Sequence, residues 1–87
     1  MKSLKEIADE MRKQFASNFS IKVDEETETI DVCKPSHNLW CQVDFDKLNQ
    51  VMTDNGLIMW MRLEVIESDK GVGMVVVPIF HLHRYIK

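Results

Sequence analysis

A long β-hairpin is predicted by residues 57–85, LIMWMRLEVIESDKGVGMVVVPIFHLHRY. Two apolar runs, 57–67 and 72–85, flank Ser68-Asp69-Lys70-Gly71, a sequence typical of a type I turn with a glycine bulge. Strict alternation fails in both runs, because apolar residues stand at odd and even positions alike. Strands of this kind are normally covered on both faces. Pro78 cannot donate to a neighbouring strand, so we expect its strand to lie at an edge, or to bulge, near that point.

This hairpin carries more apolar side chains than one layer of two helices readily covers. Two arrangements would account for the surplus: the helices lie on opposite faces of the sheet, or a second chain covers one face. We expect the second arrangement, a homodimer formed through the outer face of the hairpin. The residues expected at this interface are Ile58, Trp60, Ile66, Val75, Val77 and Ile79.

Before the hairpin, the first thirty-odd residues predict a helix and two strands. Ser3-Leu4-Lys5-Glu6 has the Ser-x-x-Glu pattern of a capping box, and apolar residues then recur at helical spacing until about Asn18. From Ser20 the apolar period changes to two. This change predicts two short strands, around residues 21–23 and 30–32.

A third strand and a short second helix are predicted next. Apolar and polar residues alternate through 41–45, which indicates a strand. Asp46 is a suitable N-cap for a helix that Asn55-Gly56 would end in the left-handed conformation. The predicted order is α-β-β-β-α-β-β. The fold class is therefore α+β, a small single domain over residues 1–87 with two helices packed on an antiparallel sheet.

The opening α-β-β-β-α order resembles that of double-stranded-RNA-binding domains, but only in topology. That family begins its second helix with a lysine cluster directed at phosphates, whereas this chain has Asp44-Phe45-Asp46-Lys47 there. The net charge of −3, from 14 acidic and 11 basic residues, also supplies no basic field for a phosphate backbone. We therefore expect no direct binding of nucleic acid.

Acidic residues cluster in the turn between the first two predicted strands. The cluster is either a solvated hairpin tip or a contact patch for a partner with a basic surface. Its members are Asp24, Glu25, Glu26, Glu28 and Asp31.

One group of residues has the chemistry of a metal site. Cys33, His37 and Cys41 are spaced four apart, and His81 and His83 would point the same way from one strand. The cysteine and histidine spacing matches no common zinc motif, and two reduced cysteines beside two strand histidines account for the same residues. We expect no metal and no other cofactor. A small metal-binding regulatory domain using Cys33, Cys41, His81 and His83 is the alternative.

The familiar catalytic motifs are absent from the sequence, including a phosphate-binding glycine loop, His-Glu-x-x-His and Gly-x-Ser-x-Gly. We expect a protein that is not an enzyme, with a small enzyme of unrecognised site as a third alternative. The charged first residues and the lack of a long apolar run predict a cytoplasmic protein with no membrane contact. The expected function is that of an acidic, homodimeric protein-interaction module that binds and modulates or inhibits a partner protein. Small inhibitors of phages, plasmids and toxin–immunity systems are proteins of this kind.

Overall fold

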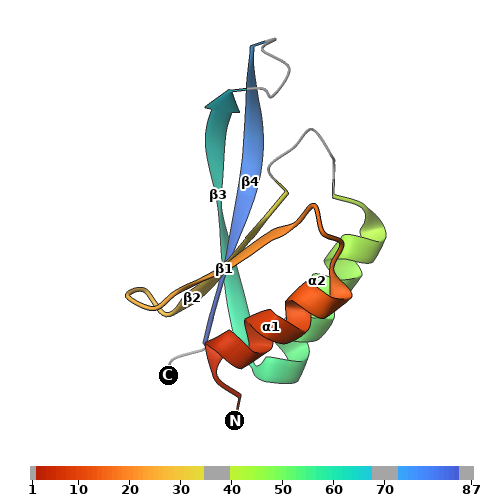
Figure 1. Ribbon diagram of the computed structural model, residues 1–87, viewed down its shortest axis with the longest axis vertical. Coiled ribbons are helices and arrows are strands. Elements are labelled where there is room, and N and C mark those ends of the chain that lie inside the picture. The colour runs from red at the N-terminus through yellow and green to blue at the C-terminus, as the bar shows by residue number, and fades with distance from the viewer. Residues whose placement is uncertain (1, 35–39, 68–72, 85–87) are drawn as a thin grey trace.

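The computed structural model describes residues 2–34, 40–67 and 73–84 (Figure 1). It confirms the predicted α+β fold with an antiparallel sheet and two helices. The elements are α1 (Leu4–Gln14), β1 (Ser20–Asp24), β2 (Thr29–Cys33), α2 (Gln42–Asn55), β3 (Leu57–Glu67) and β4 (Met74–Arg84). The order α-β-β-α-β-β has one strand fewer than predicted before α2. The turn predicted at residues 68–71 lies outside the described residues.

Helix α1 begins with the predicted capping box. The backbone N–H of Glu6 donates to Ser3 Oγ at 3.2 Å, and the backbone N–H of Ser3 donates to Glu6 Oε1 at 3.3 Å. The helix ends at Gln14, before the predicted Asn18, because Phe15 takes an extended conformation and its N–H caps the carbonyl of Met11. Phe15 thereby places its ring in the core.

The strand predicted at residues 41–45 is wrong, because these residues open α2. Cys41 is the N-cap, and its backbone N–H donates to Asp44 Oδ2 at 3.0 Å. Asp46, the predicted N-cap, lies inside the helix and accepts a hydrogen bond from Gln42. Five alternating residues fit a strand and the start of a helix equally well, and the carboxylate of Asp44 favours the helix by satisfying a free N–H.

The four strands form one antiparallel sheet in the order β1-β2-β4-β3. Strand β4 pairs with β3 along all eleven of its residues, but with β2 only between Phe80 and His83. At Pro78 its sole partner among the described strands is therefore β3, through Leu63. The prediction that the strand is an edge near Pro78 is confirmed. The left-handed end of α2 at Gly56, with φ +62°, is also confirmed.

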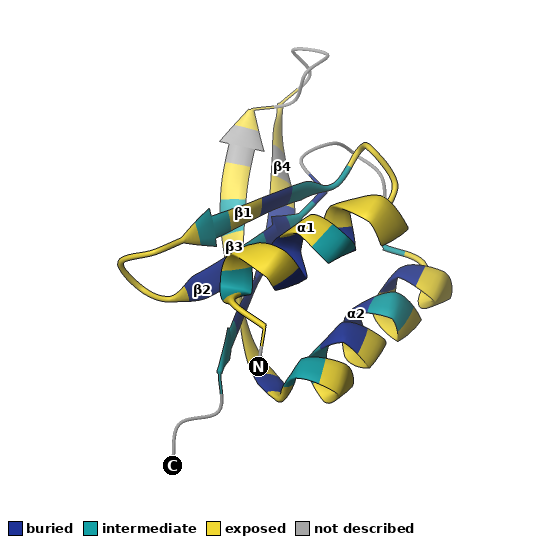
Figure 2. Cartoon of the chain, turned by 60° about the horizontal axis from the view of Figure 1, so that its bottom comes forward, coloured by how far each residue is buried: buried dark blue, intermediate teal, exposed yellow. Residues whose placement is uncertain are grey.

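Both helices pack on the same face of the sheet (Figure 2). The alternative in which they cover opposite faces is wrong. One core joins them to side chains of all four strands, and it has these members: Ile7, Ala8, Met11, Phe15, Ile21, Ile30, Val32, Leu48, Val51, Leu57, Phe80 and Leu82. Below, the face that carries the helices is called the helix side, and the other is called the open face.

The two edges of the sheet differ. On β1 the guanidinium of Arg12, from α1, donates to the carbonyl of Ile21 through Nε at 3.2 Å and Nη2 at 2.7 Å. The other edge, β3, has eleven residues and extends with β4 well beyond the helices (Figure 1). The molecule is accordingly elongated, with principal extents of 44 × 26 × 18 Å.

The carboxylate of Asp44 stabilises the start of α2 in a way that depends on pH. Hydrogen bonds from the Cys41 N–H and from Lys34 Nζ, at 2.8 Å, lower the pKa of Asp44 from 3.8 to about 2. The native state thus favours the carboxylate, and this contribution is full above the unfolded pKa and disappears as the pH falls towards 2. Asp44→Asn should lower the free energy of unfolding at pH 7 by about 2 kcal/mol in urea titrations.

The same variant should lose its disadvantage in acid. Between pH 4 and pH 2 the difference from the wild type should shrink, because the wild type then protonates Asp44 too. Asp46→Asn is the matched control, since the exposed side chain of Asp46 accepts a hydrogen bond from the Gln42 side chain within the same helix. Equal losses for the two variants at pH 7 would contradict the role given to Asp44.

Candidate interaction surface

The half of the hairpin that extends past the helices exposes large apolar side chains on the helix side. The register places Met61 beside Phe80, Leu63 beside Pro78 and Val65 beside Val76, so these residues share a face with the core. These side chains are nevertheless exposed, Leu63 by 62%. We call this set the hairpin strip; its members are Met59, Met61, Leu63, Val65, Met74 and Val76.

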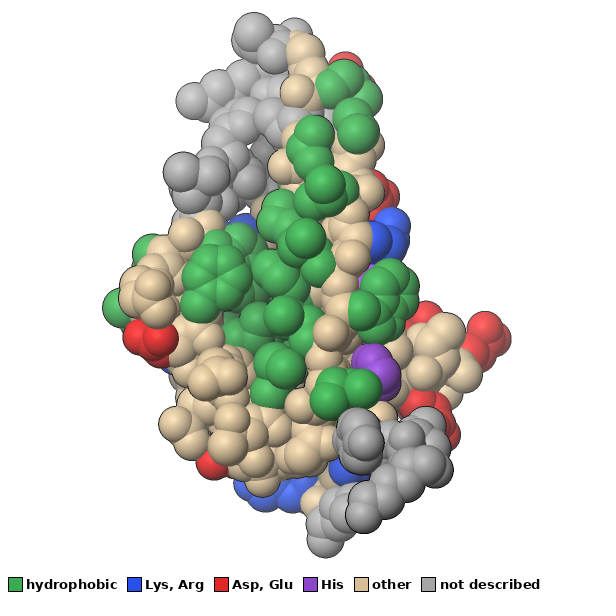
Figure 3. All heavy atoms as spheres, turned by 180° about the vertical axis from the view of Figure 1, so that it is seen from behind, with side chains coloured by type: hydrophobic (Ala, Val, Ile, Leu, Met, Phe, Trp, Pro, Cys, Tyr) green, Lys and Arg blue, Asp and Glu red, His purple; other side chains and the backbone are tan. Residues whose placement is uncertain are grey.

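The start of α2 continues the hairpin strip sideways. Val43 and Phe45 are exposed there, and the ring of Phe45 packs on Trp40 and Phe80, with ring centroids 5.2 and 6.1 Å apart. Trp40 also stacks edge-on against Phe19 at 5.0 Å. Figure 3 shows hydrophobic side chains running up the hairpin in a band that joins those on the body of the domain. The aromatic cluster thus anchors the base of the strip.

This apolar surface is larger than a monomer of this size normally exposes. Its eight residues, exposed by 40 to 63%, present on the order of 800 Å², because a large side chain has roughly 200 Å² of surface. The largest apolar patch on a typical monomer is about 300–600 Å². One partner in a specific protein–protein interface contributes about 800 Å². The strip and the exposed start of α2 together therefore have the size of a protein contact surface.

The interface residues predicted from the sequence lie on the open face. Ile58 and Trp60 are exposed there, Trp60 by 49%, whereas Ile79 is half-buried and Val77 is only 4% exposed. The register puts Ile66 and Val75 on the same face, but their side chains lie outside the described part of the structure. A partner approaching this face would reach Ile58 and Trp60 directly, but not Val77.

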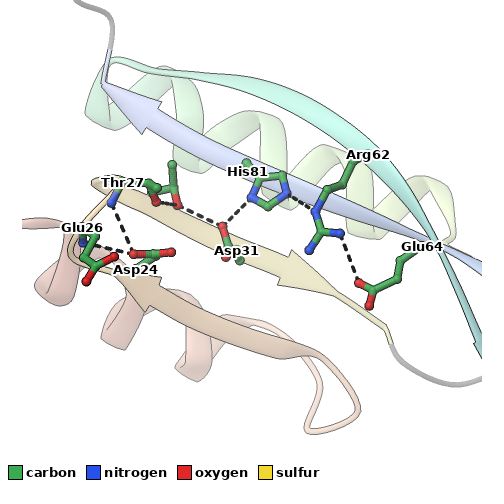
Figure 4. A network of polar contacts seen from close by, with 8 residues as sticks. Asp24, Glu26, Thr27, Asp31, Arg62, Glu64 and His81 are labelled. Atoms are coloured by element: carbon green, nitrogen blue, oxygen red, sulfur yellow. Dashed lines mark hydrogen bonds and ion pairs between the residues drawn. The ribbon is translucent and has the colours of Figure 1, made fainter.

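A polar network crosses the open face and joins β2, β4 and β3 (Figure 4). His81 Nδ1 lies 2.6 Å from Asp31 Oδ1, and Arg62 Nε donates to His81 Nε2 at 3.1 Å. Since Nε2 accepts a hydrogen bond, the proton of the neutral ring is on Nδ1 and is donated to Asp31. Arg62 also pairs with Glu64 at 3.4 Å, and the ring of Trp60 stacks on that of His81 at 4.1 Å.

His81 connects Asp31 of β2 with Arg62 of β3 through its two ring nitrogens. Both ring nitrogens have partners within the chain, and the histidine is buried beneath Trp60. Burial raises the pKa of the Cys33 thiol, so this thiol is a poor nucleophile. No described residues form a group of three metal ligands, and His37 lies outside the described part. Cys41 and His83 contact Asp44 and the Arg84 carbonyl.

The acidic turn separates into structural and exposed carboxylates. Asp24 accepts hydrogen bonds from the backbone N–H groups of Glu26 and Thr27, which closes the turn between β1 and β2. Asp31 belongs to the His81 network. The side chains of Glu25, Glu26 and Glu28 are exposed and available to a partner, and Asp24, although it closes the turn, is exposed as well. The sequence showed the charge of this run, but the partner of Asp31 is 50 positions away.

No family model, curated protein or solved structure matches this chain. Neither helix of the described portion has the length and apolar character needed to cross a membrane.

Asp31 and Glu25 belong to the same acidic run, but we expect their removal to have different effects on stability. Asp31→Ala leaves a buried N–H of His81 without its acceptor, so the free energy of unfolding should fall by about 1–3 kcal/mol. Glu25→Ala removes an exposed carboxylate from the same acidic run and should change stability by less than about 0.5 kcal/mol. Urea denaturation followed by circular dichroism measures both. Similar losses in the two variants would remove Asp31 from its structural role.

Proposed function

We propose that this chain is a non-catalytic protein-interaction module that binds a partner protein through the hairpin strip and so modulates or inhibits it. The observation that carries the proposal is the strip together with Val43 and Phe45 at its base: about 800 Å² of apolar surface, most of it on a hairpin that projects from the folded body. Solvent-exposed apolar surface of this size is typical of protein contact sites.

The build of the hairpin suits it to binding. All eleven residue pairs of β3 and β4 keep one register, so the strip is held in a regular array before a partner arrives. A pre-ordered surface loses less conformational entropy on binding. Met59, Met61 and Met74 supply flexible side chains that can adapt to a partner's shape. The partner proposed is a protein with an apolar patch of matching size.

The remaining groups of the chain support a role in binding rather than in catalysis. Within the described residues, the carboxylate and imidazole that lie closest together, Asp31 and His81, are joined to Arg62 and are covered by Trp60. Both cysteines are free thiols, as is usual in a reducing compartment, and we propose the cytoplasm as the setting. A basic partner surface would meet Glu25, Glu26 and Glu28 as a separate contact.

Affinity capture from the native host tests the strip by comparison of variants. Val76→Asp places a charge in the strip on β4, while Thr53→Asp places the same charge on an exposed position of α2 outside it. Both variants should remain folded by circular dichroism. Quantitative mass spectrometry should find a protein retained by the wild type and by Thr53→Asp but lost with Val76→Asp. If every captured protein is retained equally by all three, the strip is not the binding surface.

A further inference from the structure

The free edge of β3 is a second unusual feature of the hairpin. β3 stands at the end of the strand order, so one side of its backbone has no partner among the described strands. It is eleven residues long, lacks proline and pairs with β4 without a bulge. Edge strands are usually protected from strand addition by such interruptions, by charged side chains or by the cover of other elements. Within the described part of the chain no strand pairs with this edge, and its charged side chains, Arg62, Glu64 and Glu67, limit which strand can be added.

We propose that two copies of the chain pair their β3 strands in antiparallel fashion about a two-fold axis at Leu63, which joins the two sheets into one. The occupant of the free edge is thus a second copy. The inference rests on the proposed role of the hairpin as the contact element. The second copy would pair with the strand edge and lie beside the four members of the hairpin strip that belong to β3, while Met74 and Val76 of the strip belong to β4.

Charge complementarity selects this register. With Leu63 opposite Leu63 of the second copy, Arg62 lies opposite Glu64 on each side of the axis, so two pairs of opposite charges form. Moving the axis to Arg62 or to Glu64 would place like charges directly opposite one another. An axis that passes between two neighbouring residues is excluded. It would place a residue of the helix side opposite a residue of the open face, whereas directly opposite residues in an antiparallel pair lie on the same face of the sheet.

The position of the helices permits the pairing. Helix α2 ends at Gly56 and meets β3 near Leu57, and the protruding half of β3 begins near Met61. Antiparallel pairing about Leu63 places the two Leu57 ends far apart, so the helix layers lie at opposite ends of the joined sheet. Met61 then faces Val65 of the second copy, and the two hairpin strips become neighbours on one face.

The apolar surface of β3 is close to what a stable dimer needs. Six large apolar side chains of this strand are 39 to 62% exposed, and together they bring up to about 600 Å². The backbone of the strand edge adds to this, against about 800 Å² per partner in a standard interface. These residues are Ile58, Met59, Trp60, Met61, Leu63 and Val65.

Variants that change the charges of Arg62 and Glu64 test the proposed register between the two β3 strands, with the dimer dissociation constant measured by sedimentation equilibrium. The wild type should be a dimer at micromolar concentration. Glu64→Arg leaves the Arg62 bond to His81 in place but sets the introduced guanidinium against Arg62 of the second copy, and it should raise the dissociation constant about tenfold. The double variant Arg62→Glu/Glu64→Arg restores opposite charges across the axis but loses the Arg62 bond to His81. It is therefore compared with Arg62→Glu alone, which loses the same bond and sets the introduced carboxylate against Glu64 of the second copy. The double variant should bind more tightly than Arg62→Glu. Glu67→Arg, which faces Met59 in this register, is the matched control and should change little.

Crosslinking gives a second readout that does not depend on these charges. In a Cys33→Ala/Cys41→Ser background, Leu63→Cys lies on the two-fold axis and should form an intermolecular disulfide on mild oxidation, whereas Thr53→Cys should not. A wild type that is monomeric at high micromolar concentration, or a double variant that dimerises no more tightly than Arg62→Glu, overturns the proposal. The affinity-capture experiment with Val76→Asp tests the proposed function separately, because Val76 lies on β4, away from the free edge of β3.

Discussion

Two helices of 11 and 14 residues cannot cover strands of 11 residues along their whole length. At 1.5 Å per residue the helices span about 16 and 21 Å, whereas the strands span about 36 Å. Both helices also pack on one face, so the core gathers at one end of the sheet. Most of what distinguishes this molecule follows from that mismatch: a folded body, a hairpin that projects from it, and apolar side chains that have no cover.

The uncovered half of the hairpin is joined to the rest of the structure through strand pairing rather than through the helices. Every residue of β3 pairs with β4, and the open face adds the bonds that join Arg62, His81 and Asp31 across three strands. Trp60 covers this network from the solvent side. The base of the hairpin is therefore fixed from both faces, by the hydrophobic core on one and by polar contacts and a stacked ring on the other. The far half projects beyond the helices, and within the described strands its pairing is that of β3 with β4 alone.

Signals that act between near neighbours could be predicted from the sequence. Ser3 and Glu6 mark the start of α1, Gly56 marks the end of α2, and the two hairpin strands follow from their apolar runs. Where two local structures competed, the prediction failed: residues 41–45 alternate like a strand, and only the hydrogen bond from Cys41 to Asp44 decides for a helix.

The candidate surface was harder to predict than the fold. Met59, Met61, Leu63 and Val65 stand at alternate positions and do share one face, but the spacing carries no information on how far the covering helices reach. Side chains on the same face as the core are thus among the most exposed in the hairpin. The contact of His81 with Asp31 spans 50 positions and depends on the crossing of β4 beside β2, which no local pattern encodes.

The bond from Arg12 to the carbonyl of Ile21 limits how large an assembly this sheet can build. A strand added beside β1 would have to displace a guanidinium that holds that carbonyl at two points, and Lys22 and Asp24 add charge along the same short edge. A chain whose two sheet edges were both open could polymerise without end, as in a fibre. Here one edge is chemically blocked and the other is self-complementary, so sheet extension closes after a single addition. The long apolar edge is thereby compatible with a protein that does not aggregate.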